Sequence, residues 1–150
     1  MAKGSNCNLI HSRRGQSMVE FALFLPLAAL IVAGIFDLGR AFFASITITN
    51  AARVGARYGA LHILNDSDSQ GICNASITEA DASGIVINYN DVTITCSSSV
   101  TCLSTGTPLA GCAADQPITV TVNYLYDDMV LKFFFPSGIP MQRQEIMLVP

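Results

Sequence analysis

The chain has 150 residues, which leaves room for one domain, and 13% of them are charged, compared with roughly 25% in a typical soluble domain. All three charges before residue 16 are cationic, whereas the segment from Gln16 onward holds all eleven acids and five Arg or Lys, a net charge of −6. An acidic body lacks the basic surface that binds nucleic acid, so we exclude nucleic acid as a partner.

The apolar residues concentrate between Met18 and Phe36, in the stretch MVEFALFLPLAALIVAGIF. As a helix, these nineteen residues would measure roughly 28 Å, close to the thickness of a bilayer core. Because basic residues precede the stretch, we expect a single-pass protein with its N-terminus in the cytoplasm and its C-terminal part outside. An ordinary cleaved signal peptide is the alternative, but the apolar helical pattern continues past residue 36 without a small-residue cleavage site.

A short motif opens this apolar stretch: residues 13–21 read Arg-Arg-Gly-Gln-Ser-Met-Val-Glu-Phe. Glu20 lies five positions after Gly15, and a carboxylate there is costly in lipid unless it is paired or lies at the headgroup boundary. The motif resembles a type IV prepilin, in which a membrane peptidase cuts after the glycine. The resemblance implies a leader of residues 1–15, a cut between Gly15 and Gln16, and pairing of Glu20 with the N-terminal amine of a neighbouring subunit.

Two further stretches narrow the resemblance. Residues 34–42 read GIFDLGRAF, and residues 50–60 read NAARVGARYGA. Over residues 13–60 the chain resembles the TadE-like minor pilins of tight adherence (Tad) pili. The partners this implies are a prepilin peptidase, other pilins that bind through the N-terminal helix, the Tad inner-membrane assembly platform and membrane lipid. The implied location is first the cytoplasmic membrane and then a cell-surface pilus.

The sequence favours one long helix over residues 16–60, with its membrane part at about 18–36. Beyond the membrane, an apolar stripe at helical spacing is expected to pack on the chain's own outer domain, with partner helices as the competing use: Phe36, Phe43, Thr47, Ala51, Val54, Tyr58 and Leu61. A second face is made of small residues, which let another backbone approach closely, either in a pilus helix bundle or against a sheet. Its members are Ala52, Gly55, Ala56 and Gly59. Asp37 and Arg40 are three apart and are expected to pair.

Four cysteines lie in the C-terminal half, apart from Cys7 in the leader: Cys73, Cys96, Cys102 and Cys112. Outside the cytoplasm they are expected to form two disulfides, with three possible connectivities. A zinc site is the alternative, but the close cysteine pairs usual at such sites are absent.

Residues 61–150 are expected to form a small extracytoplasmic domain, so that the fold class is α+β: a long N-terminal helix packed on a small antiparallel β-sheet. Ser76 to Glu79 resembles a capping box that begins a short helix, and Gly84 is expected to end it. The strands are expected at Ile85–Tyr89, Val92–Cys96, Ile118–Tyr126 and Met141–Val149, with a turn at Asn90-Asp91, a surface loop over 97–114 and an apolar run at 130–135.

No catalytic, cofactor or metal constellation is evident in the sequence. His62 has no obvious acid or nucleophile partner, and Asp66 and Asp68 lack the other ligands of a calcium loop. Asn65 and Asn74 fit the short glycosylation pattern. We therefore expect a minor pilin that contributes to pilus assembly and adhesion, not an enzyme. The alternatives are a membrane-anchored binding or adhesin module, or the main subunit of a type IV-like filament.

Overall fold

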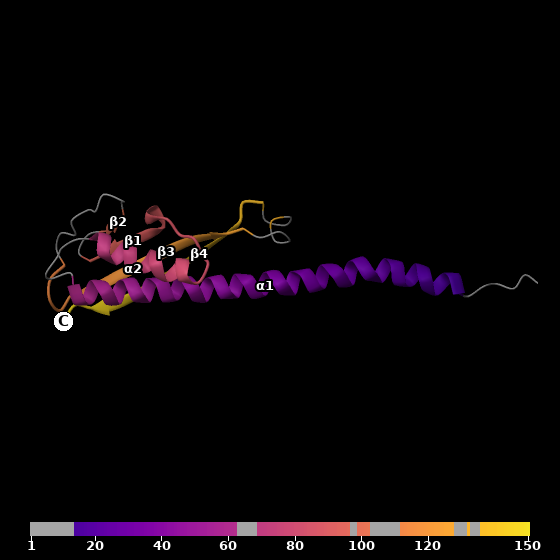
Figure 1. Ribbon diagram of the computed structural model, residues 1–150, viewed down its shortest axis with the longest axis horizontal. Coiled ribbons are helices and arrows are strands. Elements are labelled where there is room, and N and C mark those ends of the chain that lie inside the picture. Colours follow the sequence, from indigo (N-terminus) through magenta and orange to yellow (C-terminus); the bar gives the residue numbers. More distant parts are fainter. Residues whose placement is uncertain (1–13, 63–68, 97–98, 103–111, 128–131, 133–135) are drawn as a thin grey trace, which may run out of the picture. The chain divides into compact units, whose positions relative to one another are not determined.

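The computed structural model describes residues 14–62, 69–96, 99–102, 112–127, 132 and 136–150, and the chain divides into two compact units, Met1–Phe36 and Asp37–Pro150. The helices are α1 (Arg14–His62), α2 (Ser69–Ala82) and the short 3-10 helix η1 (Tyr89–Asp91). The strands are β1 (Val92–Thr95), β2 (Ser99–Thr101), β3 (Pro117–Tyr126) and β4 (Ile139–Leu148), as labelled in Figure 1.

The first unit, within its described residues, is the apolar part of α1, which contains Pro26. Every large apolar side chain between Met18 and Phe36 is more than half exposed. The most apolar window of α1 has a mean hydropathy of 2.4 with no buried residue, so this helix is long and apolar enough to cross a membrane.

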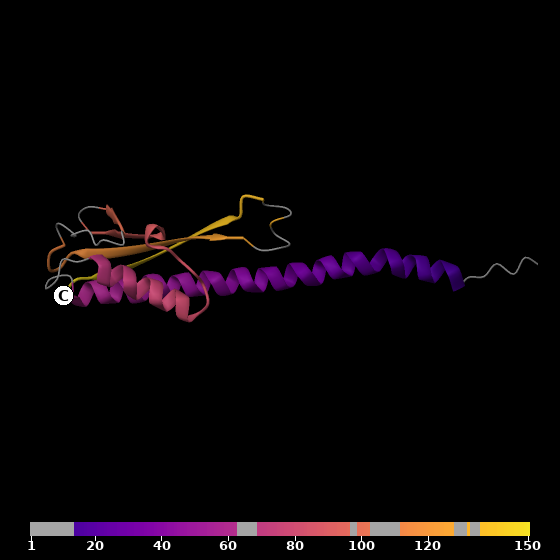
Figure 2. The same cartoon turned by 45° about the horizontal axis from the view of Figure 1, so that its top comes forward.

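The second unit has two layers, in which the C-terminal half of α1 and the antiparallel helix α2 cover one face of a four-stranded antiparallel sheet (Figure 2). The strand order is β2-β1-β3-β4, and the long β3–β4 ladder pairs Pro117 with Leu148 and Tyr126 with Ile139. The core forms where the inward side chains of β1 and β3 meet the helices: Val92, Ile94, Ile118, Val120 and Val122 are fully buried. The α+β fold expected from the sequence is confirmed.

The buried surface of α1 is made mainly of small residues together with Ile48, and most of the expected apolar stripe lies outside it. Ala52 and Ala56 are fully buried, whereas Phe43 and Leu61 of the expected stripe are 54% and 59% exposed. Among the stripe residues of this unit only Thr47 and Ala51 are buried. The physical reason is that small side chains let the helix backbone approach the sheet, and the branched residues of β3 fill the remaining space.

The helix α2 begins at Ser69, seven residues before the expected capping box, so that prediction is wrong. Ser76 lies buried in mid-helix, and its Oγ donates a hydrogen bond to the carbonyl oxygen of Ile72 at 3.1 Å. The helix continues upstream because Ile72 and Cys73 bury their side chains in the core. Its end is as expected: Gly84 has a φ of +77°, and the N–H of Ile85 bonds to the carbonyl of Ala80.

Three of the four expected strands are present, with shifts of one or two residues at their ends. The strand expected at Ile85–Tyr89 is absent: Ile85 and Ile87 are buried, which gives the alternating pattern, but they pair with no strand. The expected turn at Asn90-Asp91 is the 3-10 helix η1, and a carboxylate oxygen of Asp91 accepts the N–H of Asn88 at 2.8 Å.

The expected surface loop over 97–114 contains a strand that the sequence did not indicate. This is β2, which pairs with β1 through Thr93 with Thr101 and Thr95 with Ser99. Its composition of Ser, Val and Thr resembles the surrounding loop, so no apolar alternation marked it. The apolar run at 130–135 lies outside the described residues, apart from Lys132.

Candidate functional site

The predicted processing site lies in the first turn of α1. The helix begins at Arg14, so that Gly15 and Gln16 belong to the turn whose backbone N–H groups have no partner within the helix. A side chain at Gly15 would have no neighbour within 4 Å among the described residues, so the described part of the chain leaves the backbone there sterically open. A protease could approach the Gly15–Gln16 bond with little unfolding, because helix ends fray readily.

One turn further along, Glu20 is the one acid between residues 15 and 36. Its Oε1 accepts a hydrogen bond from the side-chain amide of Gln16 at 3.4 Å, and the residue is exposed among apolar neighbours. A neutral amide at this distance compensates little of the cost of a carboxylate in lipid. A cation brought to this carboxylate would remove most of that cost, so Glu20 has the chemistry of a pairing site.

The four small residues expected to serve in helix assembly do not present a free surface. Ala52, Gly55, Ala56 and Gly59 are all buried in the outer unit. A Cβ at Gly55 would collide with the Oγ of Ser76, and one at Gly59 would lie 2.5 Å from the Cδ1 of Ile118. These residues seat α1 against α2 and β3 of the same chain, which was the other use considered for them, and their role in assembly stays a prediction.

Large apolar side chains lie instead on the part of α1 that faces away from the sheet. Leu38 and Phe42 are both 69% exposed, and Phe43 and Ile46 are about half exposed. Leu38, Phe42 and Ile46 lie outside the apolar stripe that the sequence predicts. Their exposure follows from the burial pattern, because the small residues that face the sheet leave these large side chains on the remaining surface of the helix.

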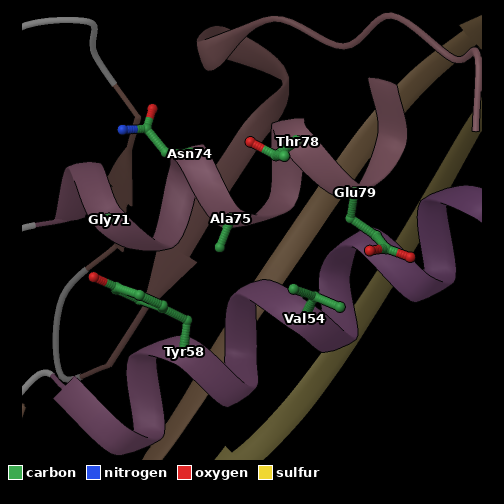
Figure 3. A pocket seen from close by; sticks show the side chains of 7 residues that line it. All are labelled: Val54, Tyr58, Gly71, Asn74, Ala75, Thr78 and Glu79. Atoms are coloured by element: carbon green, nitrogen blue, oxygen red, sulfur yellow. The ribbon is translucent and has the colours of Figure 1, made fainter. Parts of the chain in front are cut away.

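A shallow groove of about 430 Å³ lies between α1 and α2 and is lined mainly by Val54, Tyr58, Ala75 and Glu79 (Figure 3). The ring of Tyr58 lies across Gly71, where a Cβ would be 2.6 Å from the ring. Figure 3 shows Asn74 and Thr78 pointing away from Tyr58, so the polar groups of the groove do not converge. The described residues of the groove thus offer no catalytic arrangement.

His62, for which the sequence offers no acid or nucleophile partner, is exposed but packed. Its ring stacks on Tyr58 with the ring centroids 4.3 Å apart, and its Nδ1 lies 3.0 Å from the carbonyl oxygen of Tyr58. Asn74, one of the two possible glycosylation sites, accepts a hydrogen bond from the hydroxyl of Tyr89 at 2.7 Å, and the Ser76 of its motif is buried. The other site, at Asn65, and the aspartates at 66 and 68 lie outside the described residues.

Two disulfides cross-link elements of the outer unit. Their pairing is one of the three connectivities that the sequence allows. Cys73 in α2 bonds to Cys102 just after β2, and Cys96 just after β1 bonds to Cys112 ahead of β3. The first bridge is fully buried, and the second is partly exposed. Because all four sulfurs are consumed in these bonds, the zinc alternative is replaced by a covalent framework for the sheet.

The described residues define a class of protein: an α+β domain that follows an apolar helix, with a single acid, Glu20, near the start of that helix. The model of the TadE-like protein family matches residues 15–57, somewhat less than a third of the chain. The resemblance to TadE-like proteins is thus confirmed over that stretch. The comparisons with curated proteins and with solved structures gave no match.

Proposed function

We propose that this protein is a minor pilin of a Tad-type pilus, with a structural and not a catalytic role in pilus assembly and surface adhesion. The observation that carries the proposal is the family match over residues 15–57, because it covers the predicted cut, Glu20 and the exposed apolar stretch together. A single helix thus unites a sterically open N-terminal turn, a carboxylate one turn later and a segment long enough to span a bilayer.

Processing would convert the exported chain into an assembly-ready subunit. A cut by prepilin peptidase after Gly15 removes Cys7 with the three leader cations, and it leaves four cysteines, all of which are paired. With the N-terminus in the cytoplasm, the outer unit lies outside, where disulfides persist. The first residue of the mature chain is then Gln16, which carries a free ammonium group.

Assembly would use two exposed parts of α1, one near its N-terminus and one beyond Phe36. The new ammonium of one subunit pairs with Glu20 of a neighbour, which offsets the cost of both charges in an apolar bundle and fixes the register of the helices. The large apolar side chains that face away from the sheet, such as Phe42 and Phe43, are available for contact with other pilins.

The size of the outer unit supports the minor role. It comprises Asp37–Pro150, most of the chain, and its sheet is fastened by two disulfides. The N-terminal helix of this chain resembles that of proteins from Tad systems, in which the main pilus subunit is little more than its N-terminal helix. A subunit with a folded outer unit is suited to a position where a domain is displayed, such as an adhesive end of the pilus.

Gene deletion and complementation test the proposal. We expect deletion to reduce pili and surface attachment, and the wild-type gene to restore both. Glu20→Gln keeps the size of the side chain but removes its charge, and it is expected to leave pili at the level of the deletion strain while the protein still reaches the membrane. Glu79→Gln, in the outer unit, is the matched control and is expected to restore pili. Normal pili in the deletion strain would refute the proposal in favour of the anchored binding module.

A further inference from the structure

One end of the outer unit combines the point where the chain leaves its apolar stretch with an exposed apolar surface. The hydroxyl of Tyr126, the last residue of β3, donates a buried hydrogen bond to the carbonyl oxygen of Asp37 at 3.0 Å. Asp37 directly follows Phe36, the last residue of the apolar stretch. The hairpin end of β3 and β4 is therefore fixed beside the first residue of α1 that follows the membrane segment.

The opposite end of the same strand lies far from this point. Ile118, near the start of β3, packs against Gly59 of α1. Because a helix rises about 1.5 Å per residue, Gly59 lies roughly 33 Å further along α1 than Asp37. The eight residues from Ile118 to Tyr126 span roughly 26 Å of strand, and the long tyrosine side chain accounts for the remainder. The sheet thus has a membrane-proximal end and a distal end.

The proximal end exposes apolar side chains from both layers of the unit. Leu38, Phe42 and Phe43 of α1 are 69%, 69% and 54% exposed, and Leu125 of β3 is 58% exposed. Pro136 and Pro140, on either side of the turn residue Gly138, are also exposed. Aromatic and apolar side chains gathered next to a membrane segment are typical of residues that contact the interfacial layer.

The acids of this end do not oppose contact with a membrane. Asp37 is only 5% exposed, so its carboxylate is shielded from the surface. Asp127 is paired with the ammonium of Lys132 at 2.7 Å. Asp91 of η1, which lines a hollow together with Leu125, is half-buried, and its carboxylate accepts the N–H of Asn88 at 2.8 Å. Acids that are shielded, paired or hydrogen-bonded beside exposed apolar side chains suit a headgroup layer without net charge.

We infer that the β3–β4 end of the outer unit rests in the headgroup layer of the membrane before the subunit enters a pilus. The partner of this contact is a zwitterionic lipid interface. This inference rests on the proposed membrane-anchored state. It adds a second contact, which would hold the domain in one orientation on the membrane while the helix awaits assembly.

Short-range quenching by brominated lipid tests the inference, because the natural chain has no tryptophan. The full chain is reconstituted in phosphatidylcholine vesicles as three single-tryptophan variants. Ser137→Trp places the probe in the exposed turn beside Gly138, and Ser99→Trp is the matched control on an exposed serine at the distal end of the sheet. Phe24→Trp, within the apolar stretch, reports whether the helix is in the bilayer.

We expect brominated lipid to remove a large part of the emission of Phe24→Trp and Ser137→Trp and none of that of Ser99→Trp. Adding Leu125→Gln to Ser137→Trp is expected to weaken the quenching, since it removes apolar contact. Quenching of Phe24→Trp without quenching of Ser137→Trp would overturn the inference and leave the anchored state intact. If Ser137→Trp instead shifts to the blue only as the protein density rises, a second copy covers this end and the lipid contact is refuted. An unquenched Phe24→Trp would overturn the anchored state itself.

Discussion

At the scale of single residues, the glycines of α1 differ in what surrounds them, although they are alike in sequence. Gly55 lies against Ser76 of α2 and Val120 of β3, where an added Cβ has no room. Gly39, in the same helix and the same unit, has no described residue within 4 Å of that position. The sequence alone identified a small-residue face, but it did not show that the chain's own helix and sheet occupy it.

This contrast predicts opposite effects of one substitution. Gly55→Ala is expected to lower the free energy of unfolding of the outer unit by about 1–3 kcal/mol, because the methyl group overpacks the α1–α2–β3 contact. Gly39→Ala is expected to be neutral or to raise it by up to about 1 kcal/mol, since alanine favours the helix. Urea denaturation in detergent, followed by circular dichroism, measures both. Equal effects of the two substitutions would contradict the packing described for Gly55.

At the scale of elements, periodicity predicted the structure where one face of an element is buried against a core. The strict alternation from Ile118 to Tyr126 became β3. The first half of α1 was predicted instead from the length of its continuous apolar run. Periodicity gave a wrong prediction where burial had another cause. Ile85 and Ile87 are buried in alternation with exposed residues, but their segment has no strand partner. The start of α2 was missed because Ser76 forms its hydrogen bond within a helix, as serine also can do.

The two disulfides are predicted to contribute differently to the same sheet. The chain-entropy model assigns loops of 16 and 29 residues about 3 and about 3.6 kcal/mol of stabilisation. The bridge between Cys73 and Cys102 is also fully buried, so replacing both cysteines with alanine additionally leaves a cavity. We expect the double variant Cys73→Ala/Cys102→Ala to lose more stability than Cys96→Ala/Cys112→Ala.

Mild reduction of the wild-type protein provides an independent check on the disulfides. The Cys96–Cys112 bridge is partly exposed, so a reductant reaches it before the buried bridge. Timed alkylation followed by peptide mapping is expected to label Cys96 and Cys112 first. Simultaneous labelling of all four cysteines would show that the two bridges open together and would contradict the distinction.

At the scale of the whole molecule, the sequence predicted most of the candidate site and less of the outer unit. Gly15, Gln16 and Glu20 form a local motif in one helix, so their spacing is readable without a structure. The disulfide pairing, the strand β2 and the occupied small-residue face depend on contacts between distant segments, for which the sequence has no local signal. The roles of the processing and pairing residues remain predictions.

The central claim is that a prepilin-type peptidase matures this chain, and the mass of its N-terminus tests that claim most directly. Protein from native membranes is purified and analysed by intact-mass and N-terminal peptide mass spectrometry, together with Gly15→Val and the control Gly34→Val, whose glycine also has an open surround. We predict that the wild type and Gly34→Val begin at Gln16 and that Gly15→Val retains its leader. A wild-type chain that begins at Met1, or after residue 36, would contradict the account.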